Sequence, residues 1–197
     1  VVARGVVERA AALAAAQGGL FTVRPLRRAR AGIVITGHEI VQGLVEDRFA
    51  PLLEAKLAAL GSEVREVVAA PDDTRVIGAH LRRLAAEGAD LILTTGGLSV
   101  DPDDVTRQAI VSAGGEVLVY GAPVLPGAMF LVARLGAVPV LGIPACGVHH
   151  AVTVLDLLLP RVLAGETLTR SALARMGHGG LCLDCPECRF PICPFGR

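Results

Sequence analysis

The sequence has few aromatic residues and no excess of either charge. Trp is absent, and Phe, Trp and Tyr together make up 3% of the 197 residues. Lys and Arg number 19, as do Asp and Glu, so the formal net charge at neutral pH is zero. Neither a basic surface for nucleic acid nor an acidic, solvating tail is therefore expected.

Long hydrophobic runs and an apolar leader are also missing. No apolar run is long enough to span a bilayer, so we expect no membrane partner. The first nine residues carry charges where a signal peptide is apolar, which argues against secretion and favours the cytoplasm. The first residue is Val rather than Met, which leaves open that the chain is a fragment of a longer protein.

Aliphatic residues are abundant, and 52% of the chain is hydrophobic. The length allows one good core with appendages. Composition divides the chain into an N-terminal helix with a basic connector, an α/β domain, and a tail that is rich in cysteine. The predicted boundaries of these three parts are 1–30, 31–166 and 167–197.

Apolar segments of strand length alternate with segments of helical periodicity. Strands are predicted at 31–36, 63–69, 91–93 and 116–120, and helices at 48–60, 75–87 and 104–113. This spacing is typical of a wound, mostly parallel sheet. A hairpin over 129–134 and 138–143 follows, and then a helix over 149–163 in which Pro160 is expected to cause a kink or an early end. No core pattern is visible from 167 to the cysteines.

The stretch from Asp90 to Thr106 has the features of a ligand-binding turn. A buried strand is followed by Gly96-Gly97 and then by three acids at the start of the next helix. Ligands of open α/β sheets bind at the carboxyl ends of strands, and free backbone N–H groups there favour an anion. A plain strand-to-helix turn with capping acids is the alternative.

Several short motifs lie in register between residues 31 and 165. They are Thr36-Gly37-His38-Glu39, Pro71-Asp72-Asp73, Thr94-Thr95-Gly96-Gly97 with Asp104-Val105-Thr106, Leu125-Pro126-Gly127 and Leu141-Gly142-Ile143-Pro144. Together they resemble the molybdopterin-binding domain family. That family is shared by molybdopterin adenylyltransferases, molybdopterin molybdotransferases and competence-damage-inducible-type proteins.

The resemblance implies a three-layer α/β/α fold that binds molybdopterin or the molybdenum cofactor, with Mg²⁺ among the accompanying ions. It assigns catalytic roles to Asp72 and Asp104, although Asp104 could instead be only a helix cap. Ligand-binding roles pass to Thr36, Gly37, Glu39, Thr95, Gly96, Gly97, Ser99, Asp101, Gly127, Gly142 and Pro144. The implied ligand is a pterin that carries a phosphate, and self-association into a homo-oligomer is expected.

Three functions remain open from the sequence. The first is cofactor binding in molybdenum-cofactor biosynthesis, transfer or insertion, with adenylyltransferase or molybdotransferase activity undecided. The second is a catalytically silent module that docks on a molybdoenzyme or maturation protein. The altered loop Ala145-Cys146-Gly147 favours it, because the family commonly has Gly-Asn-Pro there, whereas the intact Thr94-Thr95-Gly96-Gly97 and Asp104-Val105-Thr106 favour the first. His38 and Leu125 also depart from the family pattern, which commonly has Asp or Asn and Lys at these places. The third, a nucleotide-amide hydrolase, is disfavoured because the additional amidohydrolase domain is not visible.

Four cysteines crowd the last sixteen residues with the spacing C-x2-C-x2-C-x4-C. Cys182, Cys185, Cys188 and Cys193 are candidate ligands of a tetrahedral zinc ion or of an iron–sulfur cluster. Four free thiols are the third possibility. Because the tail is rich in Pro and Gly, we expect it to be poorly ordered without metal and to act as a metal-dependent docking element.

Overall fold

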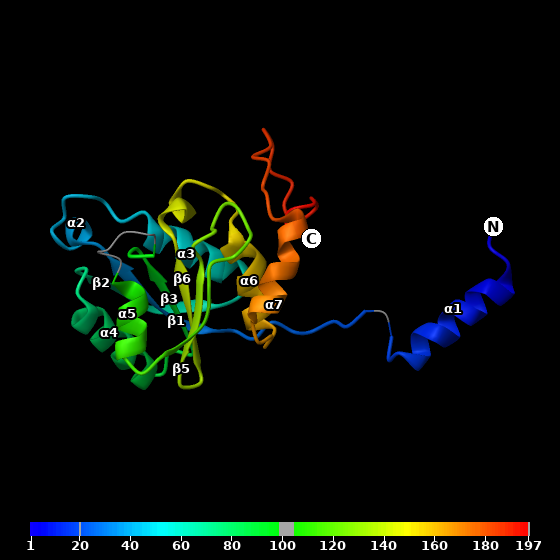
Figure 1. Ribbon diagram of the computed structural model, residues 1–197, viewed down its shortest axis with the longest axis horizontal. Helices are drawn as coiled ribbons and strands as arrows, with labels where there is room; N and C mark the ends of the chain where they lie inside the picture. The colour runs from blue at the N-terminus through cyan, green and yellow to red at the C-terminus, as the bar shows by residue number, and fades with distance from the viewer. Residues whose placement is uncertain (20, 99–104, 197) are drawn as a thin grey trace.

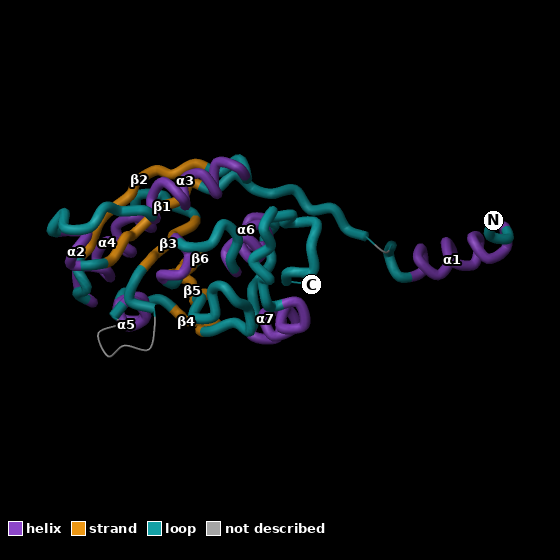
Figure 2. Tube along the Cα trace, turned by 90° about the horizontal axis from the view of Figure 1, so that it is seen from above, coloured by secondary structure: helices purple, strands orange, loops and turns teal. Residues whose placement is uncertain are grey.

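The computed structural model of the chain describes residues 1–19, 21–98 and 105–196. Over these residues a sheet of six strands has the order β2-β1-β3-β6-β5-β4, which Figure 2 shows from above the view of Figure 1. The strands are β1 (Arg30–Thr36), β2 (Glu63–Ala70), β3 (Leu91–Thr95), β4 (Glu116–Tyr120), β5 (Leu131–Leu135) and β6 (Val138–Ile143). Strands β2, β1, β3 and β6 are parallel, whereas β5 is antiparallel to both of its neighbours.

Helices cover both faces of this sheet. They are α2 (His38–Val41), α3 (Phe49–Ala59), α4 (Thr74–Ala86), α5 (Thr106–Ser112), α6 (Val154–Leu163) and α7 (Arg170–Arg175), with the 3₁₀ turns η1 (Ala145–Val148) and η2 (Met176–Gly179). Side chains of α3 and α6 form one core with the sheet, and side chains of α4 and α5 form the other. The predicted three-layer α/β/α fold with a mostly parallel sheet is confirmed.

The central strands are apolar on both faces because each face meets a helical layer. Ile33 and Ile35 join the core beneath α3 and α6, while Val34 between them joins the core beneath α4 and α5. All three side chains are buried. A continuous apolar run such as 33–35 is what a parallel strand covered on both faces requires.

The N-terminal helix α1 (Arg4–Ala16) stands apart from the sheet in both views (Figures 1 and 2). None of its residues is buried. The connector meets the domain at Arg27, whose backbone N–H donates to Leu163 O at 2.9 Å and whose Nη1 donates to Asp90 Oδ1 at 2.8 Å. No helix among the described residues is both long enough and apolar enough to cross a membrane.

Helix α6 begins five residues later than the sequence analysis predicts. A capping box sets its start: Thr153 Oγ1 accepts a hydrogen bond from Leu155 N at 3.2 Å, and Asp156 Oδ2 accepts one from Thr153 N at 2.7 Å. His149 and His150, which the predicted range 149–163 places at the start of the helix, lie in the turn before it. The helix also continues past Pro160 to Leu163.

The segment after α6 contains order that the sequence analysis does not predict. Helix α7 has six residues, which is too short to show a helical period in the sequence. Leu168, Leu173 and Met176 are nevertheless buried in the core beneath α6. Core residues are therefore present in a stretch where the sequence shows no core pattern.

Replacement of Leu173 tests whether α7 belongs to the core. Its side chain is 1% exposed, so Leu173→Ala should lower the free energy of unfolding by about 2–5 kcal/mol. Leu183→Ala is the matched control, because Leu183 is 71% exposed and its truncation should change stability by less than about 0.5 kcal/mol. Urea unfolding measures both, and equal effects would show that α7 is not packed as described.

Candidate functional site

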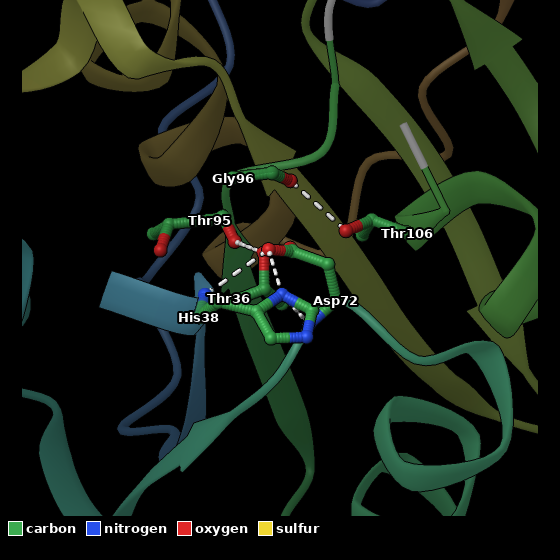
Figure 3. A network of polar contacts seen from close by, with 6 residues as sticks. All are labelled: Thr36, His38, Asp72, Thr95, Gly96 and Thr106. Carbon is green, nitrogen blue, oxygen red and sulfur yellow. Dashed lines mark hydrogen bonds and ion pairs between the residues drawn. The ribbon is translucent and has the colours of Figure 1, made fainter. Parts of the chain in front are cut away.

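The parallel strands β2, β1 and β3 end side by side, and polar groups gather at these carboxyl ends (Figure 3). Thr36, the last residue of β1, donates a hydrogen bond from Oγ1 to Thr95 O, the last residue of β3, at 2.8 Å. The chain leaves β1 toward β2 on one side, while β3 lies on the other. This is the switch point at which open α/β sheets bind ligands.

His38 and Asp72 join the turn after β1 to the turn after β2. Asp72 Oδ2 accepts a hydrogen bond from His38 N at 3.1 Å and lies 3.1 Å from His38 Nδ1. The His38 side chain is 61% exposed and that of Asp72 is 28% exposed, so solvent and ligands can reach the pair. In the sequence His38 stands out only as a departure from the family pattern, because nothing local shows that it meets an aspartate 34 residues away.

The turn after β3 depends on two glycines with left-handed backbone. Gly96 has φ +77° and Gly97 has φ +53°. A Cβ on Gly96 would lie 2.8 Å from Thr36 O, and one on Gly97 would lie 2.7 Å from Thr106 Oγ1. Thr106, at the start of α5, donates from Oγ1 to Gly96 O at 2.9 Å. No side chain can therefore replace either hydrogen without moving the turn.

The last two residues of β3 contribute buried hydroxyl groups. Thr94 Oγ1 and Thr95 Oγ1 have no hydrogen-bond partner among the described residues. A buried hydroxyl group without a partner costs about 1–3 kcal/mol. The Thr95 hydroxyl, at the end of the strand, is a candidate donor or acceptor for a ligand at this edge.

A second group of predicted residues lies around the end of β6. Pro126, Gly127, Pro144 and Cys146 line a cavity of about 380 Å³ together with His150. No Lys or Arg occurs in its described lining. Burial raises the pKa of the Cys146 thiol. The cavity is therefore apolar, with sulfur and imidazole as its polar groups.

Both its backbone conformation and close packing require glycine at position 127 in this loop. Its φ is +113°, and a Cβ there would lie 3.2 Å from Val154 N at the start of α6. The loop that precedes β5 is thereby held against the first turn of that helix. Close packing of this kind requires glycine even before a ligand is considered.

Three further predicted residues lie in β6 or in the turn and short helix that directly follow β1. Gly142 is inside β6, where a Cβ would lie 2.7 Å from Leu98 Cδ1, so its missing side chain serves packing in the core. Glu39 is exposed on the short helix α2, and Gly37 is buried, with its N–H donating to Ala70 O at 3.1 Å. The remaining predicted residues, Ser99, Asp101 and Asp104, lie outside the described residues.

The tail cysteines do not form a ligand set as they are positioned. All five cysteines of the chain are free thiols. Among residues 1–19, 21–98 and 105–196, no three His, Cys, Asp or Glu side chains are arranged so that they could hold one metal ion. The zinc or iron–sulfur site on Cys182, Cys185, Cys188 and Cys193 therefore stays a prediction.

Comparison with protein families identifies the domain that builds this site. Residues 32–164 match the family model described as "Probable molybdopterin binding domain". A CinA-like protein of Mycobacterium sp. (strain MCS) is 44% identical over 91 residues, which are 46% of this chain and 22% of that protein. A CinA-like protein of Mycobacterium tuberculosis (strain ATCC 25618 / H37Rv) is 43% identical over 91 residues, 46% of this chain and 21% of that protein. The match thus spans about a fifth of these relatives' length.

Solved structures share the fold at lower sequence identity. The protein CinA from Thermoplasma acidophilum has a TM-score of 0.58 and 20% identity, covering 67% of this chain and 96% of that chain. The molybdopterin biosynthesis enzyme MoaB from Thermus thermophilus has a TM-score of 0.56 and 24% identity, covering 70% of this chain and 98% of that chain. At these identities the likeness establishes the fold.

Alanine at Gly96 tests the close approach of β1 and β3. Gly136 in the β5–β6 hairpin has φ +59° and open space at its Cβ position, so Gly136→Ala should cost only the left-handed strain of about 1–2 kcal/mol. Gly96→Ala adds overlap with Thr36 and should cost a further amount of about 1–3 kcal/mol. Urea unfolding of both variants measures the difference. Equal losses would mean that Thr36 does not constrain position 96.

Asp73 makes stability depend on pH through its cap on α4. Hydrogen bonds from Val76 N and Arg75 N lower the pKa of its carboxyl group below the ordinary value. The stabilisation is therefore complete above the unfolded-state pKa of about 4 and is lost as pH falls through the lower folded-state pKa.

Asp73→Ala should consequently reduce the thermal midpoint at pH 7 by about 2–4 °C, and the difference from the unmodified chain should shrink toward pH 3. Asp73→Asn is the control, since asparagine caps the helix without titrating. Thermal unfolding from pH 3 to 7 measures all three chains. An Asp73→Ala deficit that stays constant over this range would contradict the assignment.

Proposed function

The chain belongs to the molybdopterin-binding domain family, and we propose that it binds molybdopterin or the molybdenum cofactor at the carboxyl ends of β1, β2, β3 and β6. The observation that supports this most directly is the Gly96-Gly97 turn at the switch point, which is bare of side chains and held against Thr36. The site extends from the Asp72–His38 pair to the cavity at Cys146.

The glycine turn suits the phosphate of the ligand. Two successive left-handed residues leave the backbone open to close approach by an anion. The Thr95 hydroxyl, which has no hydrogen-bond partner within the described part of the chain, adjoins this turn and is a candidate donor to a phosphate oxygen. The residues present at this edge therefore fit the acidic end of a pterin phosphate.

The Asp72–His38 pair suits the pyrimidine end of a pterin, which carries hydrogen-bond donors and lies opposite the phosphate. The pyrimidine part of a pterin carries an amino group and a ring N–H, and a carboxylate accepts hydrogen bonds from both kinds of donor. His38 contacts Oδ2 of Asp72 through its backbone N–H and its ring, which orients the carboxylate. In this proposal Asp72 binds the ring and His38 is the residue that positions it.

The residues at positions 125 and 146 favour binding over group transfer. Leu125 and Cys146 stand where the family commonly has a lysine and an asparagine, and the described cavity lining has no Lys or Arg. A charged transition state would find little stabilisation there. We therefore place the protein in biosynthesis, transfer or insertion of the cofactor as a binding component, with a maturation protein or molybdoenzyme as its partner.

Asp72→Asn tests this assignment. Asparagine keeps the size of the side chain but replaces one carboxylate oxygen by an N–H donor, so affinity for molybdopterin should fall at least about tenfold. Anaerobic fluorescence titration with molybdopterin released from a molybdoenzyme measures the dissociation constant. Glu63→Gln is the matched control, because Glu63 is exposed at the opposite, amino end of the same strand β2.

Two outcomes would contradict the proposal. Equal affinity of Asp72→Asn and the unmodified chain would remove Asp72 from the site. Failure of the unmodified chain to bind molybdopterin at micromolar concentration would leave the family fold without its ligand, as a silent docking module requires.

A further inference from the structure

The cysteine-containing tail forms a loop whose two ends are fixed to the domain. Leu125 N donates to Gly180 O at 2.6 Å, and Cys182 N donates back to Leu125 O at 2.8 Å. At the other end, Gly196 N donates to Gly179 O at 2.7 Å. Residues 180–196, here called the tail loop, are therefore closed at the base.

Apolar contacts reinforce the far end of the tail loop. The Phe195 side chain is 5% exposed in the core beneath α6, and its ring meets Phe190 edge to face at 6.5 Å between centroids. Two aromatic side chains and three backbone hydrogen bonds thus connect both ends of the loop to the domain. The expectation that the tail is poorly ordered without metal stays a prediction.

All four tail cysteines border one cavity. Cys182, Cys185, Cys188 and Cys193 line a space of about 260 Å³ beneath the tail loop. The Cys182 and Cys193 side chains are half-buried and pack against the core, whereas those of Cys185 and Cys188 are exposed. Asp184, between the first two, has the left-handed φ of +49°, which turns the chain back within three residues.

The half-buried cysteines, Cys182 and Cys193, are held by the core, whereas the exposed cysteines, Cys185 and Cys188, are freer to move. Residues 183–189 are all exposed, so no core contact opposes an inward shift of Cys185 and Cys188 toward the anchored pair. A tetrahedral zinc ion needs its four sulfur atoms about 3.8 Å apart, given Zn–S bonds of about 2.3 Å. An inward movement of residues 183–189 would bring the four thiol groups to these distances from one another.

We propose that Cys182, Cys185, Cys188 and Cys193 bind one metal centre coordinated by four thiolates, either a zinc ion or an iron–sulfur cluster, inside the tail loop. Each thiol gives its proton to solvent as its metal–sulfur bond forms, so four protons are released per centre. Both centres are thiophilic, and the spacing suits both. Zinc binding transfers no electron, and a [2Fe–2S] cluster assembled from ferric iron and sulfide likewise needs no oxidant or reductant.

The position of this centre gives it a structural role beside the ligand site. Cys182 also lines the 380 Å³ cavity that contains Cys146 and Gly127. The segment that carries Cys182 pairs with Leu125, directly before Pro126-Gly127. A bound metal would therefore fix one wall of that cavity. This assignment does not depend on pterin binding, and its test uses no pterin.

The experiment is anaerobic purification of the full chain with elemental analysis for zinc and iron, followed by reconstitution with Zn²⁺ or with iron and sulfide. We expect one zinc per chain in a colourless protein, or iron with matching acid-labile sulfide and visible absorbance. Mass-spectrometric mapping of alkylation should show the four tail thiols reacting at least about tenfold more slowly with metal than after chelation.

Variants identify the ligands. Cys185→Ser and Cys188→Ser, alone and together, should lose the metal, and because both positions are exposed the fold should be retained. Cys146→Ser, the fifth cysteine outside the tail loop, is the matched control and should keep it. Alkylation of the unmodified chain before and after chelation supplies a second measurement that needs no variant.

Three results would overturn the proposal. The first is retention of metal by the double variant. The second is less than about 0.1 equivalent of either metal after both reconstitutions, since thiolate sites bind zinc tightly. The third is a pair of disulfides among the four tail cysteines in the anaerobically purified chain.

Discussion

The close contact between the ends of β1 and β3 is the constraint on which the site depends. Thr36 Oγ1 donates to Thr95 O across the switch point, and the backbone of Gly96 lies so near Thr36 that a Cβ has no room. Because the two strands are held in register, the turns that follow them are held as well. The edge proposed to bind the ligand is thus a consequence of sheet packing rather than of a separate loop structure.

The two halves of this edge have different chemistry. The turns after β1, β2 and β3 present glycine backbone, hydroxyl groups and the Asp72–His38 pair, which suit a ligand with both a phosphate and ring N–H groups. The cavity after β6 presents Pro144, Cys146 and aliphatic surface. In its described lining, the second half has neither the carboxylate nor the hydroxyl groups of the first.

Elements with a strong local signal were predictable. Strands β1 and β3 are apolar runs bounded by polar or glycine residues, and α4 has apolar side chains on one side, so sequence periodicity located them. Helix α7 was not predicted, because its six residues make less than two helical turns. Its Leu173 can be assigned to the core only once the packing with α6 is known. Helix α6 starts later than its apolar pattern predicts, because the Thr153–Asp156 capping box sets its first turn.

The sequence by itself determined the alternation of strands and helices, the glycine turn after β3 and the motifs in register along the chain, because these are local or evenly spaced properties. Only the tertiary structure decided which turns meet. It paired His38 with Asp72 across 34 residues, placed Gly142 inside β6 against Leu98, and brought the tail loop beside Cys146. The physical reason is that strand order and helix packing set these distances, and neither is encoded in any single stretch of the chain.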